Sequence, residues 1–246
     1  MKMKNNIIYI LLLTFFINAC SNDSDSTSST KDGSGGSLAI FALKGNYLYT
    51  VDNENLNIFS LINQEQPIKV NDLSVGFNIE TLFSNGDYLY IGSRNGMFIY
   101  SIENPENPTL LSNVQHLTAC DPVVSNGTHS FVTLHSNNTC GNNINVLEVY
   151  DTSNATNPTL LHTRNLTSPK GLGLYNNFLF VCDDVIKIFD ISTPENPILV
   201  HIIDKFCYDV IIKDNDLFTI GINGMNRYLL NPSAITNIQF KSEINY

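Results

Sequence analysis

The sequence contains no tryptophan, few basic residues and no apolar segment long enough to span a membrane. Its 13 Lys and Arg residues stand against 23 Asp and Glu, which gives a net charge of −10. An acidic surface repels phosphate backbones and the chain has no basic stripe, so we expect no nucleic-acid binding. The main apolar run, residues 7–17, is too short to cross a bilayer as a mature helix.

The sequence also lacks the short motifs of common enzyme classes. It contains no GxSxG, HExxH, P-loop or GxGxxG pattern. Its five cysteines form no CxxC pair of the zinc-binding type. No helical periodicity of useful length occurs after residue 37, whereas 11 Tyr and 14 Phe provide flat side chains that cover half-buried strands. These absences leave an all-β domain as the predicted class.

One phrase of about twelve residues recurs along the chain. Its clearest copies begin at Ile186, Met97 and Leu147, a fourth begins at Leu56 and a shortened fifth at Asn226. A period near 40 residues in a β-rich chain predicts the blades of a β-propeller. The copies align on five aromatic residues at steps of 41, 50, 39 and 39: Phe59, Tyr100, Tyr150, Phe189 and Tyr228.

Each repeat reads as four short strands, which we expect to lie antiparallel from the central channel outward. The second strand is dense in aromatic and β-branched residues, as in Tyr47–Val51 and Phe178–Cys182. Gly, Asn or Asp residues precede this strand in every repeat and suit a tight hairpin. The sequence therefore predicts an all-β, five-bladed propeller of four-stranded antiparallel blades, at about residues 38–75, 76–116, 117–166, 167–204 and 205–246.

The repeated phrase also carries the signal that ends its strand. Asp151 and Asp190 are short acceptors that can bond backbone N–H groups of the following turn. The Asn-Pro pair beyond them cannot continue a ladder of hydrogen bonds, so we expect the chain to leave the sheet there.

The first residues form a targeting signal rather than part of the folded domain. Two lysines precede the apolar run, and Ile17-Asn-Ala-Cys20 resembles a bacterial lipobox. That resemblance implies a lipoprotein signal peptide at residues 1–19, cleavage before Cys20 and acylation of the Cys20 sulfur. Residues 20–37 are rich in Ser, Thr, Gly and Asp, so we expect a disordered linker ahead of a domain at residues 38–246.

The linker also resembles a sorting signal. The acidic pair Asp23 and Asp25 is similar to the surface-export signal of Bacteroidota lipoproteins. The acyl chains implied at Cys20 would anchor the protein durably. We therefore expect a lipid anchor in the bacterial outer membrane with the domain exposed at the cell surface. The choice between inner and outer leaflet stays open.

Two copies of the repeat resemble a known family. Ile186-Lys-Ile-Phe-Asp190 and Leu147-Glu-Val-Tyr-Asp151, each followed by a loop that contains proline, resemble the LVIVD repeat of bacterial β-propellers. The phrase Tyr208-Asp-Val-Ile211 is similar to lipoproteins of that family from Bacteroidota. The resemblance covers essentially residues 38–246. It implies a propeller fold and an envelope location, and it carries no established activity.

Three acidic residues fall at one level of the predicted blades. Aligning the innermost strands places Glu80, Asp121 and Asp209 at the channel mouth, with Lys170 beside Gly171 of the fourth blade. Three carboxylates without cations raise one another's pKa, and a bound Ca²⁺, Mg²⁺ or cationic group would relieve the repulsion. We interpret Glu80, Asp121, Lys170 and Asp209 as a candidate ligand or cation site. The alternative is that the acids bond only neighbouring backbone amides.

Four further cysteines fall on one predicted face of the propeller. An oxidising envelope favours disulfides, and a Cys120–Cys140 bond would hold the long loop of the third blade. Cys182 and Cys207 lie on adjacent blades and form a second, weaker candidate pair. Packed free thiols are the alternative for both pairs.

The sequence favours a binding or interaction module over an enzyme. Recognition surfaces are built from loops over a rigid scaffold, and one predicted face bears Asp121, Cys140, Lys170 and Asp209. We expect a protein or carbohydrate ligand and a monomer that is held at the membrane by its lipid. The alternative is an envelope hydrolase that uses Glu80, Asp121 and Asp209 as acid and base.

The lipobox resemblance predicts acylation at a single residue. Cys20→Ala should abolish incorporation of labelled palmitate, because the sulfur that accepts the lipid is lost. Metabolic labelling followed by fluorography measures this. Ser21→Ala is the matched control and should label as the wild type does, whereas label retained in Cys20→Ala would contradict the assignment.

Overall fold

A computed structural model describes residues 35–115, 122–136 and 144–246. In this part of the chain, twenty β-strands form five four-stranded sheets, and all strand pairs are antiparallel. Each sheet consists of four consecutive strands and is one blade. Within the described residues, no helix has the length and apolar character needed to cross a membrane. The predicted all-β, five-bladed propeller is confirmed.

The blades follow one another along the chain. Blade 1 consists of β1 (Phe41–Lys44), β2 (Tyr47–Val51), β3 (Asn55–Ser60) and β4 (Ile68–Ser74). Blade 2 consists of β5 (Ile79–Asn85), β6 (Tyr88–Ser93), β7 (Gly96–Ser101) and β8 (Thr109–Gln115). Blade 3 consists of β9 (Val123–Ser125), β10 (His129–His135), β11 (Asn145–Asp151) and β12 (Thr159–Asn165). Blade 4 consists of β13 (Leu172–Tyr175), β14 (Phe178–Cys182), β15 (Ile186–Asp190) and β16 (Ile198–Ile203). Blade 5 consists of β17 (Asp209–Lys213), β18 (Asp216–Gly221), β19 (Gly224–Leu229) and β20 (Gln239–Asn245).

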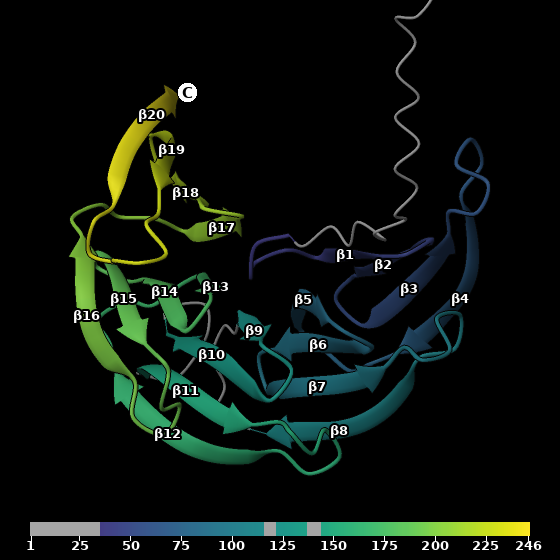
Figure 1. Cartoon of the computed structure of the whole chain (residues 1–246). Coiled ribbons are helices and arrows are strands. Elements are labelled where there is room, and N and C mark those ends of the chain that lie inside the picture. Colours follow the sequence, from purple (N-terminus) through teal and green to yellow (C-terminus); the bar gives the residue numbers. More distant parts are fainter. Residues whose placement is uncertain (1–34, 116–121, 137–143) are drawn as a thin grey trace, which may run out of the picture. The chain divides into compact units, whose positions relative to one another are not determined.

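The first strand of each blade lies innermost and the fourth lies outermost (Figure 1). Contacts link these inner strands in series, from β1 to β5, β9, β13 and β17. A cavity of about 100 Å³ lies among them, and its lining includes Phe83, Val124, Leu172 and Val210. The centre of the propeller is therefore narrow and largely apolar.

A residue with positive φ stands in the turn between the first two strands of every blade. The φ angles are 56° at Gly45, 56° at Gly86, 96° at Gly127, 52° at Asn176 and 54° at Asp214. Gly, Asn and Asp tolerate this conformation, which matches the twist of a tight hairpin. The turn chemistry predicted from the sequence is confirmed in all five blades.

The third strand ends as the repeated phrase predicts. Asp151 and Asp190 each accept a hydrogen bond from the backbone N–H two residues ahead, at 2.9 and 2.8 Å. Bonds from the serine two residues ahead, through its hydroxyl and its backbone, hold the pKa of both carboxyl groups below the usual range. Ser60 and Ser101 accept the equivalent backbone bond through their hydroxyl oxygens, at 3.5 and 3.3 Å.

The aromatic residue on which the repeats align marks a β-bulge in every blade. A bulge adds to the right-handed twist of a sheet, which helps successive blades to fan around the channel. The register between the third and fourth strands shifts immediately before each of these five residues: Phe59, Tyr100, Tyr150, Phe189 and Tyr228.

Two aromatic positions per blade build the core between blades. Four hydrophobic clusters lie between blades 1 and 2, 2 and 3, 3 and 4, and 4 and 5. One set of aromatics, on the third strands, faces the preceding blade and is at most 5% exposed: Tyr100, Tyr150, Phe189 and Tyr228. A second set, on the second strands, faces the following blade and is fully buried: Tyr49, Tyr90, Phe131 and Phe180.

The junction between blade 5 and blade 1 differs from the other four. Phe218 of blade 5 and Phe59 of blade 1 hold the equivalent aromatic positions, but both are only half-buried. Among the described residues, no hydrophobic cluster joins these two blades. Strands β18–β20 also diverge from β2–β4 (Figure 1). The outer parts of these two blades therefore share no packed core of described residues.

This difference predicts that replacing the second-strand phenylalanine by alanine lowers the free energy of unfolding by different amounts in blades 4 and 5. Phe180→Ala should lower the free energy of unfolding by about 3–5 kcal/mol, because it empties a fully packed junction. Phe218→Ala should cost clearly less, because its ring is already partly in water. Urea denaturation of both variants measures the difference, and equal losses would show that the junction between blades 5 and 1 is packed like the others.

Candidate functional site

One buried carboxylate joins the last blade to the segment that precedes the first blade, close to the central channel. Asp209, the first residue of β17, accepts hydrogen bonds from the Ser37 hydroxyl at 2.9 Å and from the Leu38 backbone N–H at 3.1 Å. The Ser37 oxygen in turn accepts a bond from the Leu172 N–H of blade 4 at 2.7 Å. Asp209 is only 7% exposed. These bonds tie blades 4 and 5 to the segment that leads into blade 1.

The Asp209 carboxylate occupies space that a side chain at position 171 would take. A Cβ built on Gly171 would overlap the Asp209 carboxyl group, and so would one built on Gly36. Burial raises the pKa of Asp209, while hydrogen bonds from Leu38, Val210 and Ser37 partly oppose that effect. The sequence alignment of the innermost strands placed Gly171 and Asp209 at equivalent positions of their blades, and in the structure the two residues are in direct contact.

Glu80 has a different environment from that of Asp209. Glu80 forms an ion pair with Arg94, with 2.8 Å between Arg94 Nε and Glu80 Oε1. Asp121 lies outside the described residues. In the described part of the chain, no group of three or more His, Cys, Asp or Glu residues has the geometry of a metal site. Glu80 and Asp209 thus have separate partners, and a shared Ca²⁺ or Mg²⁺ site stays a prediction that depends on Asp121.

A disulfide fixes the loop that leads into blade 5. It joins Cys182, the last residue of β14, to Cys207, with 5.3 Å between the Cα atoms. Both cysteines are fully buried. This is the pair that the sequence ranked second; Cys120 and Cys140 lie outside the described residues. The bond holds residues 204–208 against the end of a buried strand, which gives their side chains a fixed platform.

Two aromatic residues flank Cys207 and lie beside Lys170. The Phe206 and Tyr208 rings meet edge to face with 5.1 Å between their centroids, and they are 39% and 38% exposed. Lys170 Nζ lies 6.0 Å from the centroid of the Phe206 ring. The backbone adds a bond from the Gly171 N–H to the Tyr208 carbonyl at 2.8 Å. A cation beside an aromatic face is favourable, so the loop and Lys170 support each other.

His135 completes what we call the lysine–aromatic cluster: His135, Lys170, Phe206 and Tyr208. It is the last residue of β10, and its Nε2 lies 3.5 Å from Lys170 Nζ. Burial lowers the pKa of His135, and the positive charge of Lys170 lowers it further. The imidazole is therefore neutral at neutral pH and can accept a hydrogen bond from the ammonium group.

A recess lies next to Phe206. Its volume is about 160 Å³, and its lining includes Lys205, Phe206, Ile222, Asn226 and Glu243. Amide, carboxylate and ammonium groups beside an aromatic ring can bind both the polar and the apolar parts of one ligand. The cluster and the recess share Phe206 and together form a candidate recognition surface. They lie at the end of the propeller where the first strand of each blade begins and the second strand ends.

The sequence named Lys170 but missed its three partners in the cluster. His135, Phe206 and Tyr208 lie at strand ends or in loops, where the five repeats share no pattern. The one usable signal was Cys207 between two aromatic residues, because a disulfide at that position anchors both neighbours.

Comparison with known proteins supports the assignment of the repeat. Three segments of the chain, residues 35–58, 83–116 and 169–205, match the family model described as the LVIVD repeat. The chain contains LVIVD repeats. No curated protein matches the sequence. The matched segments include the first two strands of blade 1, most of blade 2 and the whole of blade 4 with Lys170 and Cys182.

The fold of this LVIVD-repeat chain is similar to that of several solved structures. A functionally unknown protein from Desulfotomaculum acetoxidans DSM 771 has a TM-score of 0.68 at 12% identity, with 84% of this chain and 69% of that chain covered. A protein from Lactobacillus plantarum has a TM-score of 0.66 at 9% identity, with 80% and 67% covered. The periplasmic gluconolactonase of Pseudomonas aeruginosa has a TM-score of 0.63 at 12% identity, with 82% and 68% covered. Identities this low show a shared fold alone.

The raised pKa of Asp209 predicts a pH dependence of stability. The Asp209 carboxyl group binds its proton more tightly in the folded protein than in the unfolded chain. The resulting contribution to the free energy of unfolding is therefore complete below the unfolded pKa of about 3.9. That contribution is lost as the pH rises through the folded-state value. Asp209→Asn cannot titrate, so the wild type should lose stability relative to this variant as the pH rises from about 4 to 7.

Urea denaturation across that pH range measures the relative stability of wild type and Asp209→Asn. Asp72→Asn, which removes an exposed carboxylate of blade 1, serves as the control for general charge effects. A relative stability that increases with pH would mean that hydrogen bonding, rather than burial, dominates at Asp209.

Proposed function

We propose that this protein is a lipid-anchored binding module of the bacterial cell envelope that recognises a protein or carbohydrate ligand through the lysine–aromatic cluster. The observation that carries the proposal is the pair of exposed rings, Phe206 and Tyr208, fixed beside Lys170 by the buried Cys182–Cys207 disulfide. Rigid aromatic side chains next to a charged group are typical of the residues that dominate binding energies.

The local charge also supports this surface. The chain as a whole is acidic, with a net charge of −10, but Lys170 lies beside the Phe206 ring and Lys205 lines the adjacent recess. With His135 neutral, the Lys170 ammonium retains donors for a ligand oxygen. A ligand that combines a ring or an apolar face with carboxylate, hydroxyl or carbonyl oxygens fits this arrangement.

Anchoring and disulfide chemistry support the envelope location in the proposal. The lipobox-like Ile17-Asn-Ala-Cys20 provides the attachment, and the outer membrane with surface exposure is the location that the Asp23 and Asp25 signal favours. A buried disulfide suits an oxidising compartment.

The hydrolase alternative has one supporting observation. A propeller of similar fold is, by its name, a periplasmic gluconolactonase. Against it, Glu80 is engaged by Arg94 and Asp209 by Ser37 and Leu38, so neither carboxylate is available as an acid or base in the described residues. Binding through the lysine–aromatic cluster therefore explains more of the geometry.

The proposal predicts that ligand capture depends on two side chains. Phe206→Ala and Lys170→Met should each reduce the amount of ligand retained by the full chain, purified from its own membranes, by roughly 30-fold, which is the loss expected at a binding hot spot of about 2 kcal/mol. Phe240→Ala, which removes another exposed aromatic ring from the outer strand β20, is the control and should retain ligand.

Quantitative mass spectrometry and glycan analysis of the co-purified material measure ligand retention. Equal retention by the wild type, Phe206→Ala and Lys170→Met would exclude the cluster as the binding surface. Loss in Glu80→Gln alone would favour the hydrolase.

A further inference from the structure

Two sheet faces at the junction of blades 5 and 1 are only partly buried by the described residues. The rear face of blade 1 consists of the side chains that point away from blade 2: Phe41, Leu43, Leu48 and Phe59. The front face of blade 5 consists of the side chains that point away from blade 4: Ile211, Phe218, Ile220, Met225 and Ile244. Phe41 is 46% exposed and Ile244 is 58% exposed.

Most of these positions are more deeply buried where a neighbouring blade is present. Leu48 is half-buried, whereas its counterparts Leu89, Leu179 and Leu217 are fully buried. The half-burial of Phe59 and Phe218, described above, follows the same rule. The greater exposure of these side chains therefore results from the lack of a packed neighbouring blade. The residues themselves are apolar, as they are in the buried cores of the other junctions.

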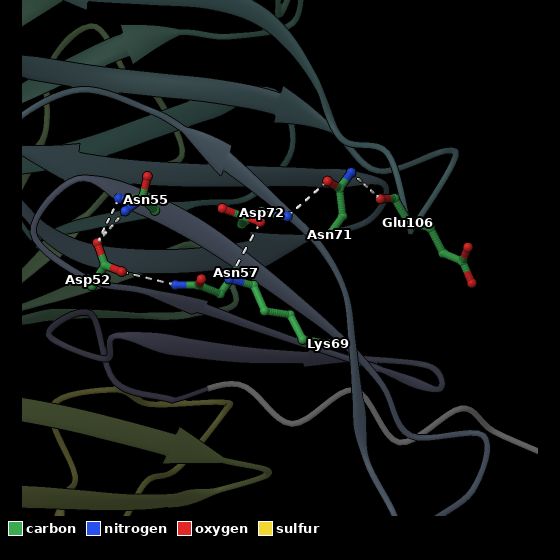
Figure 2. A network of polar contacts seen from close by, with 7 residues as sticks. All are labelled: Asp52, Asn55, Asn57, Lys69, Asn71, Asp72 and Glu106. Carbon is green, nitrogen blue, oxygen red and sulfur yellow. Dashed lines mark hydrogen bonds and ion pairs between the residues drawn. The ribbon is translucent and has the colours of Figure 1, made fainter.

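The outer part of the rear face of blade 1 is polar rather than apolar. Figure 2 shows the Asn57 amide bonded to Asp52 at 3.2 Å and Lys69 paired with Asp72 at 3.5 Å. Hydrogen bonds from the backbone of Glu54 and Asn55 lower the pKa of Asp52 to about 2, so its carboxylate stays charged at neutral pH.

The front face of blade 5 also contains both apolar and polar side chains. Its inner strands present Ile211, Phe218 and Ile220, whereas Arg227 further out forms two bonds with Asp216 at 2.9 and 3.0 Å. Both faces therefore carry apolar side chains on their inner strands and polar pairs beside them, and on blade 5 the apolar surface continues outward through Met225 and Ile244.

In the described part of the chain, hydrogen bonds join blades 5 and 1 close to the central channel. The donors are Ser37 and Leu38 and the acceptor is Asp209, whereas Phe41 and Ile244 of the two faces remain exposed. Among the described residues, the front face of blade 5 and the rear face of blade 1 therefore lack the packed neighbour that the other blade faces have.

We propose that a second copy of this chain covers these faces, with the rear face of blade 1 in one copy packed on the front face of blade 5 in the other. Front-to-rear packing already occurs at four junctions within each copy, so the chain encodes both complementary surfaces. Such a head-to-tail contact joins different patches of the two copies. The lysine–aromatic cluster shares no residue with the two faces, so this proposal is independent of the proposed binding function.

Sedimentation velocity of the full chain in density-matched detergent tests the association. The wild type should show a concentration-dependent species with at least twice the protein mass of one copy. Phe41→Lys on the rear face and Ile244→Lys on the front face should each reduce that species at least tenfold, because a charge cannot be buried unpaired. Both positions are exposed within one copy, so the fold should tolerate the change, which circular dichroism checks.

Ile198→Lys is the matched control, because Ile198 is 55% exposed on the outer strand β16 and belongs to neither face. This variant should associate as the wild type does. Mixing Phe41→Lys with Ile244→Lys should restore a species of two copies, since one intact front face and one intact rear face then remain. A patch that pairs with itself would not be restored in this way.

Two results would overturn the proposal. The first is a wild type that stays a monomer, as the sequence analysis expects, which would mean that the faces are covered within one copy or by another molecule. The second is equal association of the wild type, Phe41→Lys and Ile244→Lys, which would assign the association to the lipid anchor and the detergent.

Discussion

The packing of one blade against the next is the interaction on which the rest of this structure depends. A single four-stranded sheet cannot bury both of its faces, so each blade supplies one aromatic to the preceding junction and another to the following one. Four junctions are filled in this way, with rings such as Phe180 and Phe189 essentially inaccessible to water. The bulge beside each third-strand aromatic adds the twist that such stacking needs.

The fifth junction relies on a different interaction. Each sheet takes its four strands from consecutive positions in the chain, so no strand of the described residues is shared between the last blade and the first. The Asp209 carboxylate performs that task through Ser37 and Leu38, close to the channel and away from water. A buried carboxylate is costly unless donors surround it, and here the backbone and a hydroxyl provide them. Asp209, which the sequence placed in the candidate cation site, therefore helps to hold blades 4 and 5 to the start of blade 1.

The candidate recognition surface follows from the same construction. Because the inner strands hold their positions through packing, the loops between blades can carry functional side chains without weakening the core. The Cys182–Cys207 bond extends that rigidity to residues 204–208, and Phe206 and Tyr208 become fixed beside Lys170. Glu80, which the repeat placed at a similar level, is instead neutralised by Arg94 from its own blade.

The sequence by itself determined the number of blades, their four-strand order, the left-handed turn residues and the acceptors that end the third strands, because these are local patterns repeated at a period near 40 residues. It also aligned Gly171 with Asp209. Only the tertiary structure decided that Asp209 bonds Ser37, that Glu80 pairs with Arg94, and that Phe59 and Phe218 are the two core aromatics left half-exposed. The physical reason is that a repeat encodes what every blade does alike, whereas partners across blades depend on how the ring closes in space.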